Sequence, residues 1–280
     1  LAYADREAYY GDPDYCDVPL GLLLSDKHAT NRLSLIGERA SLEQRPSILA
    51  GYEHLSDGVV ERALALVEKE VSEDAGEPTM AHLSEKRGDT VHLDVIDRWG
   101  NVISVTPSGG WLQSNPVIPE LGFALNSRAQ MFWLDEGLNQ SLTPGTRPRT
   151  TLSPSLAWDN NDATMAFGTP GGDQQDQWQL ILFLRHVHGI DNLQACMDMP
   201  LFHSQHFNSS FYPRAAHPGR LMIESNIGEQ TIKELRKRGH IVDVAGPWSI
   251  GRLTAAKRYG DGTIKAAATP RLMQAYAVGR

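Results

Sequence analysis

The stretch TVHLDVIDRWGNVISVT, residues 90–106, carries a strong signal for β-structure. Its first part alternates, with apolar side chains at positions 91, 93 and 95 and polar ones at 90, 92 and 94. A period of two residues is that of a β-strand. Residues 97–101 supply turn signals and residues 102–106 return as a second strand. The stretch therefore predicts a β-hairpin that begins at Thr90.

The segments before the hairpin are predicted to be helical and then irregular. Residues 1 to about 47 mix aromatic and acidic residues with turn signals, which is typical of short helices and connections. Apolar residues recur at helical spacing from Asp57 to about Val71, with Asp57 as the N-cap. Residues 72–88 lose this periodicity and gain charge, Gly and Pro, as an exposed linker does.

The segments after the hairpin predict further strands and then helices. Strands are expected near residues 122–125, 153–158 and 163–167, and helices at 177–188 and 227–238. Strands followed by helices, without regular alternation of the two, favour a layered α+β structure over a doubly wound sheet.

Composition excludes several classes of protein. The 280 residues carry 26 Lys+Arg against 34 Asp+Glu, and the net charge of −8 argues against a nucleic-acid partner. No apolar run approaches the length of a membrane span. Cys16 and Cys196 allow at most one disulfide and leave the compartment open, cytoplasmic or periplasmic. The chain begins at Leu1 without a methionine, which we interpret as a fragment or a processed product.

Thr90 and a later glycine pair are candidate catalytic residues. A threonine hydroxyl needs an adjacent base, and its own α-amine can serve once the chain is cut before it, here between Asp89 and Thr90. Gly171 and Gly172 form a turn between a predicted strand and helix, where two N–H groups can face one oxyanion. Taken singly, a strand that starts with Thr and a turn that contains Gly are both common structural features.

Two other clusters of residues are candidate binding sites. Residues 147–154 contain two arginines with Thr150 and Thr151, and such groups hold substrate carboxylates as readily as they form a solvated loop. Histidines occur at positions 186, 188, 203 and 206. No cysteine or clustered carboxylate completes a ligand set around them, so neither a metal nor a cofactor is expected.

In their order along the chain, the motifs resemble the γ-glutamyltransferase (glutathione hydrolase) family of N-terminal nucleophile hydrolases. Residues 2–6, 11–15 and 18–19 are similar to the late part of that family's large subunit, and the hairpin from Thr90 to the start of its small subunit. The family's substrate-holding hydroxyls are similar to residues 147–154, and its oxyanion glycines to residues 169–172. Two later motifs of the family are similar to residues 200–203 and 269–271.

The resemblance implies a four-layer αββα sandwich and self-cleavage between Asp89 and Thr90. Residues 1–89 would be the C-terminal part of the large subunit plus a linker, and residues 90–280 the small catalytic subunit, both within one domain. The Gly171 and Gly172 N–H groups would stabilise the oxyanion, and Thr150 and Thr151 would hold the substrate. The early large subunit is expected as a missing partner, and a homo-oligomer is possible.

Two departures from the family bear on the substrate. Ser108 replaces the second threonine that steadies the nucleophile, and it retains a hydroxyl. Arg128 and Met131 stand where the family holds the glutamyl α-amino group with acidic or amide residues. A guanidinium repels an ammonium group and attracts a carboxylate.

A small anionic amide is therefore the expected substrate. Its acyl group would lack the α-amino group, as in relatives similar to cephalosporin acylases or oxamate amidohydrolases. True γ-glutamyl or glutathione hydrolysis is the alternative within the enzyme class. A non-catalytic module that keeps the sandwich to bind a small anion is the alternative outside it.

Overall fold

The computed structural model describes residues 1–56, 58–62, 90–109, 116–159, 164–211, 214–273 and 275–279. The predicted hairpin is confirmed, since β1 (Leu93–Ile96) pairs antiparallel with β2 (Val102–Val105). Asp97 sets the turn, because its carboxylate accepts hydrogen bonds from the backbone N–H groups of Trp99 and Asn101, both at 2.9 Å. Gly100 has a φ of +87°, a backbone conformation that favours glycine.

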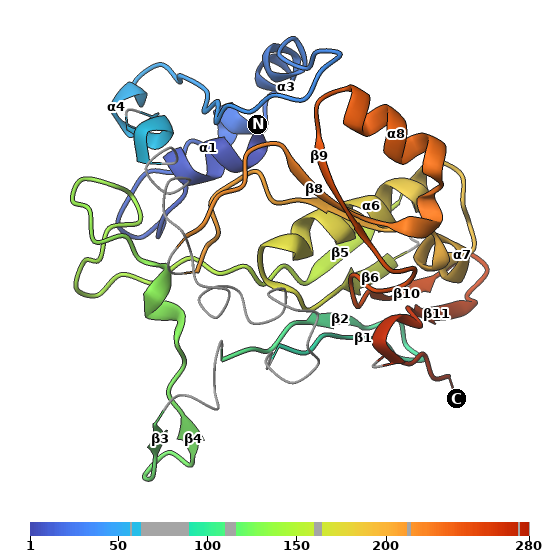
Figure 1. The fold of residues 1–280 in the computed structure, drawn as a ribbon. Helices are drawn as coiled ribbons and strands as arrows, with labels where there is room; N and C mark the ends of the chain where they lie inside the picture. The colour runs from blue at the N-terminus through green and yellow to red at the C-terminus, as the bar shows by residue number, and fades with distance from the viewer. Residues whose placement is uncertain are drawn as a thin grey trace.

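A four-stranded antiparallel sheet lies against the hairpin (Figure 1). Its order is β11 (Ile264–Ala268), β10 (Thr254–Arg258), β6 (Thr164–Gly168), β5 (Ser155–Trp158). The last two strands confirm the predictions at 153–158 and 163–167. The other face of the sheet is covered by α6 (Gln175–Val187), close to the predicted helix at 177–188, and α7 (Leu193–Asp198).

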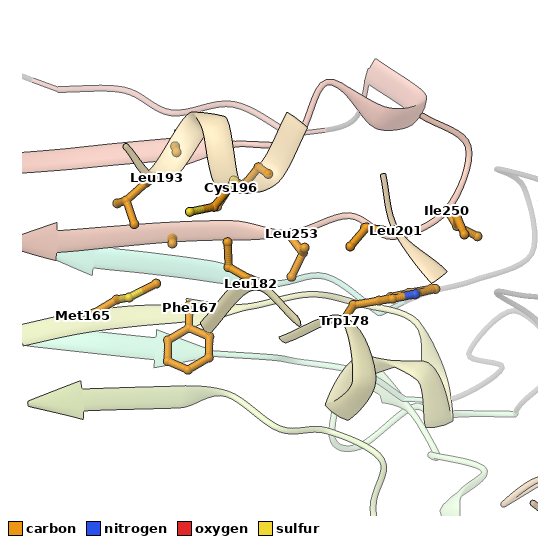
Figure 2. Close-up of a cluster of buried hydrophobic side chains, with 12 residues drawn as sticks. Met165, Phe167, Trp178, Leu182, Leu193, Cys196, Leu201, Ile250 and Leu253 are labelled. Carbon is orange, nitrogen blue, oxygen red and sulfur yellow. The ribbon is translucent and has the colours of Figure 1, made fainter. Parts of the chain in front are cut away.

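The main hydrophobic core lies between this sheet and its two helices. Figure 2 shows Met165 and Phe167 of β6 packed with Trp178 and Leu182 of α6, and Leu253 lies beside them. The described residues thus form three layers: helices, a four-stranded sheet and a hairpin.

The hairpin turns its polar face inward. Ser104 Oγ donates to the carbonyl of Phe167 at 3.3 Å across the gap between the sheets. The apolar residues of the hairpin point the other way, with Val91 56%, Leu93 43% and Val95 48% exposed. The face that alternation alone suggests for the core is therefore the outer face among the described residues.

A third, three-stranded sheet packs beside the core. It consists of β7 (Phe202–Ser204), β8 (Arg220–Glu224) and β9 (Ile241–Ala245), with β8 parallel to β9 across α8 (Glu229–Lys237). Helix α8 confirms the prediction at 227–238. Other elements are short: β3 (Val117–Ile118), β4 (Phe123–Ala124) and the 3-10 turns Arg128–Met131, Gly172–Gln174, Ser225–Ile227 and Arg271–Met273.

The N-terminal segment is helical, as predicted. It contains α1 (Ala2–Tyr9), α2 (Leu20–Leu23), α3 (Asp26–Leu33) and α4 (Glu53–Ser56). Residues 59–62 are also helical, and the rest of the helix predicted to Val71, like the linker at 72–88, lies outside the described residues. Within the part that the structure describes, no helix has the length and apolarity needed to cross a bilayer.

Candidate active site

The register of the hairpin places Thr90 opposite Ser108. Leu93 pairs with Val105, and the ladder continues outward through a hydrogen bond of 3.1 Å from Val91 N–H to the Pro107 carbonyl. Continuing the count puts residue 90 across from residue 108. The side chains meet there, because Thr90 Oγ1 donates to Ser108 Oγ at 2.8 Å. The sequence thus brings together its candidate nucleophile and its candidate steadying hydroxyl.

Arg128 reaches the same pair of hydroxyls. It begins the 3-10 turn Arg128–Met131, and its Nη2 donates to Ser108 Oγ at 2.9 Å. Its guanidinium carbon lies 5.9 Å from the centre of the Phe211 ring. A fixed positive charge thus stands two hydrogen bonds from the Thr90 hydroxyl, where it attracts an anionic group.

The glycine pair requires glycine at Gly171 for two reasons. Gly171 has a φ of +136° and Gly172 a φ of +55°, both in the region that disfavours other residues. A Cβ at Gly171 would also collide with the Trp178 ring, 3.1 Å from Cη2 and closer to Cζ3. The turn joins β6 to α6, which is the strand-to-helix setting that the sequence predicts.

Helix α1 is fastened to this turn through Asp173. Arg6 Nη2 donates to Asp173 Oδ1 at 3.1 Å, and Tyr3 Oη donates to the Asp173 carbonyl at 2.9 Å. Ser210 N–H donates to Asp173 Oδ2 at 2.7 Å. The first helix of the chain and the glycine pair are thus held in one rigid arrangement.

A cavity of about 510 Å³ opens beside Thr90. Thr90 lines it together with Pro170, the residue before the glycine pair, and with Arg252. Residues 275–278 near the C-terminus form part of its wall. Thr90 and the start of the glycine turn therefore border one space large enough for a small substrate.

The comparison with protein families identifies the family of this chain. The Gamma-glutamyltranspeptidase model matches residues 1–279. The chain belongs to the γ-glutamyltranspeptidase family.

Several proteins are similar to this member of the family. The solved structure of a threonine-to-alanine variant of LmbA2991 is 50% identical with a TM-score of 0.85, over 100% of this chain and 47% of that one. The glutathione hydrolase proenzyme of Bacillus subtilis strain 168 is 25% identical over 270 residues, 96% of this chain and 41% of that protein. The oxamate amidohydrolase proenzyme of Klebsiella pneumoniae is 32% identical over 189 residues, covering 66% and 34% respectively. The matches therefore span less than half the length of each of these three relatives.

The two arginines of the loop at 147–154 form ion pairs within the protein. Arg147 Nη2 pairs with Asp12 Oδ1 at 2.6 Å, and this hydrogen-bonded contact lowers the pKa of the Asp12 carboxyl. Arg149 Nη1 pairs with Glu7 Oε1 at 2.6 Å. Both arginines thus hold carboxylates of the protein itself. Thr151 is 4% exposed and its hydroxyl has no hydrogen-bond partner among the described residues, whereas the Thr150 hydroxyl accepts from Leu152 N–H at 3.0 Å.

The histidines lie in separate environments. His203 is fully buried against Trp178, with ring centres 5.4 Å apart, and burial lowers its pKa to about 3. His206 accepts from Gly219 N–H at 3.0 Å, and His186 contacts Lys257 Nζ at 2.9 Å. Among the described residues no group of three or more His, Cys, Asp or Glu could hold a metal ion.

The sequence reasoning missed two residues near Thr90. His92 and Asp94 are buried between the two sheets and hydrogen-bonded to each other at 3.0 Å. Alternation places both residues on the same face of the strand as Thr90, and this shared face is the feature of the sequence that could have identified them.

Proposed function

We propose that this protein is an N-terminal nucleophile amidohydrolase or acyltransferase in which Thr90 is the nucleophile. The observation that carries the proposal is the 2.8 Å hydrogen bond between Thr90 and Ser108 at the end of the hairpin. Cleavage of the bond between Asp89 and Thr90 would free the Thr90 amine; Asp89 itself lies outside the described residues. The relatives named proenzymes support this route.

The reaction proceeds in two steps. Thr90 Oγ1 attacks the amide carbonyl while its α-amine accepts the hydroxyl proton. The N–H groups of Gly171 and Gly172 stabilise the oxyanion. The amine of the substrate then takes the proton from the Thr90 α-amine and leaves, and the acyl group stays on Thr90 as an ester. Water or a second amine then attacks the ester carbonyl and gives a proton through the Thr90 α-amine to Thr90 Oγ1, which releases the acyl group.

The substrate is a small amide whose acyl group carries a carboxylate. Arg128 supports this choice because its charge lies two hydrogen bonds from the nucleophile. Oxamate, the substrate in the name of the Klebsiella pneumoniae relative, belongs to this class. A γ-glutamyl amide is the second candidate, supported by the glutathione hydrolase of Bacillus subtilis. Thr150 and Thr151 are the proposed hydroxyls that hold the acyl group.

A four-layer αββα sandwich is the proposed architecture. The described residues supply helices, sheet and hairpin, and the exposed apolar face at Val91, Leu93 and Val95 is where a further layer would pack. Residues 1–89 and 90–280 would then be two parts of one domain, which the contacts of Arg6 and Tyr3 with Asp173 support.

N-terminal sequencing and intact mass measurement of the purified full-length protein test the proposal. We expect two polypeptides that meet at Thr90, and one uncut chain in the Thr90→Ala variant. Thr30→Ala, on the exposed surface of α3, is the matched control and should be cut normally. Release of amine from oxalyl, glutaryl and γ-glutamyl anilides then identifies the acyl group. An uncut wild-type chain whose turnover survives Thr90→Ala would refute the proposal, and anion-dependent stabilisation without turnover would favour a binding module.

A further inference from the structure

A buried row of polar side chains runs between the two sheets and ends at Thr90. His92 Nδ1 lies 2.7 Å from Thr106 Oγ1, and His92 Nε2 lies 3.0 Å from Asp94 Oδ1. The second carboxylate oxygen, Asp94 Oδ2, accepts from Thr254 Oγ1 of β10 at 2.7 Å. The His92 and Asp94 side chains are 1% and 2% exposed. The proposed mechanism uses none of these groups.

Both ring nitrogens of His92 are engaged, which fixes the ring. The Asp94 carboxylate can only accept a hydrogen bond, so Nε2 of His92 is the donor to it. Nδ1 faces the Thr106 hydroxyl. The order hydroxyl, imidazole, carboxylate is that of a hydrolytic triad. Thr106, however, is not among the described residues that line the cavity beside Thr90, so its hydroxyl is not presented to a substrate there.

The ring of His92 also rests on the backbone of Gly168. A Cβ at Gly168 would lie 2.7 Å from His92 Nδ1 and nearer still to Cε1, so the ring occupies the space of a side chain there. Gly168 is the last residue of β6, and Thr169 and Pro170 connect it to Gly171 and Gly172. The residue two positions before His92 is Thr90. The imidazole thus stands between the strand of the nucleophile and the strand of the glycine pair.

We propose that His92 is a positioning residue, clamped by Thr106 and Asp94, that sets the separation between Thr90 and the oxyanion-stabilising turn after Gly168. The inference rests on the proposed roles of Thr90 and the glycine pair. Asp94 ties the clamp to the four-stranded sheet through Thr254. Displacement of a nucleophile by about 1 Å costs on the order of a hundredfold in rate. Loss of the ring should therefore lower kcat and leave KM nearly unchanged.

A double-mutant cycle tests the clamp on the cleaved protein, with the anilide that the wild type turns over. We expect His92→Ala and Gly168→Ala each to lower kcat about 10- to 100-fold with KM within about threefold. In the His92→Ala background the methyl group at 168 has room, so adding Gly168→Ala should cost less than about threefold. Surface variant His188→Ala is the matched control and should keep the wild-type kcat.

Thr254 provides a second test that preserves side-chain volume. Thr254→Val removes the hydroxyl that holds Asp94 and should lower kcat, whereas Thr254→Ser keeps the hydroxyl and should restore most of it. Thermal unfolding confirms that each variant is folded. If Thr90→Ala is inactive while folded His92→Ala and Thr254→Val keep their kcat, the clamp is refuted and the nucleophile stands. If the penalty of Gly168→Ala is equal in both backgrounds, the clamp is likewise refuted. If Thr90→Ala remains fully active, the proposed function fails and the clamp fails with it.

Discussion

Replacing Arg128 by glutamine should separate recognition of the acyl carboxylate from alignment of the nucleophile. In the structure Arg128 Nη2 donates to Ser108 Oγ at 2.9 Å, and Ser108 in turn accepts from Thr90. A hydrogen bond that involves a charged group contributes about 1.5–3 kcal/mol. For a substrate without a carboxylate, only the bond to Ser108 is lost, and kcat/KM should fall about 10- to 150-fold. For a carboxylate substrate a second interaction of similar size is lost, and the fall should reach about a thousandfold.

The assay compares two anilides of equal length, a glutaryl anilide and its uncharged carboxamide analogue. The kcat/KM for the glutaryl anilide divided by that for the carboxamide should drop about 10- to 100-fold in Arg128→Gln. Added salt should lower the same ratio in the wild type, because it screens the charge of Arg128. Arg98→Gln, an exposed arginine in the turn of the hairpin, is the control and should keep the ratio. If Arg128→Gln slows both substrates equally, the carboxylate is bound elsewhere and the argument for an anionic acyl group fails.

Three further variants test other parts of the structure. Gly171→Ala should abolish turnover and lower Tm more than Gly189→Ala does. Both glycines have a positive φ, but of the two only Gly171 lies against the Trp178 ring. Equal effects of the two substitutions on Tm would contradict this. Arg271→Met removes the guanidinium that pairs at 2.6 Å with the fully buried Glu224 carboxylate, which keeps its backbone N–H donors. The variant should lose about 3–5 kcal/mol of stability by urea unfolding, and a loss under about 1 kcal/mol would contradict this. His203 has a folded pKa of about 3, below its unfolded value, so stability should fall by about 2 kcal/mol from pH 7 to pH 5, and His203→Phe should remove that slope.

The sequence predicts the local parts of the site well, because they depend on neighbouring residues. Alternation and the turn at Asp97 predict the hairpin, and its register alone places Ser108 opposite Thr90. The glycine turn between a strand and a helix was predicted for the same reason. What could not be predicted depends on contacts between distant segments. Arg149, for example, pairs with Glu7, which lies 142 residues earlier in the chain.

The direction in which the hairpin faces is the part that alternation could not determine. A period of two separates an apolar face from a polar face, and burial normally favours the apolar one. Here the polar face is buried, which is tolerable because His92, Asp94 and Thr106 satisfy one another and Thr254 completes the set. At the end of this face the half-buried Thr90, the proposed nucleophile, borders the cavity. A polar face turned inward is therefore what the proposed role of Thr90 needs, and the exposed apolar face at Val91, Leu93 and Val95 is its structural consequence.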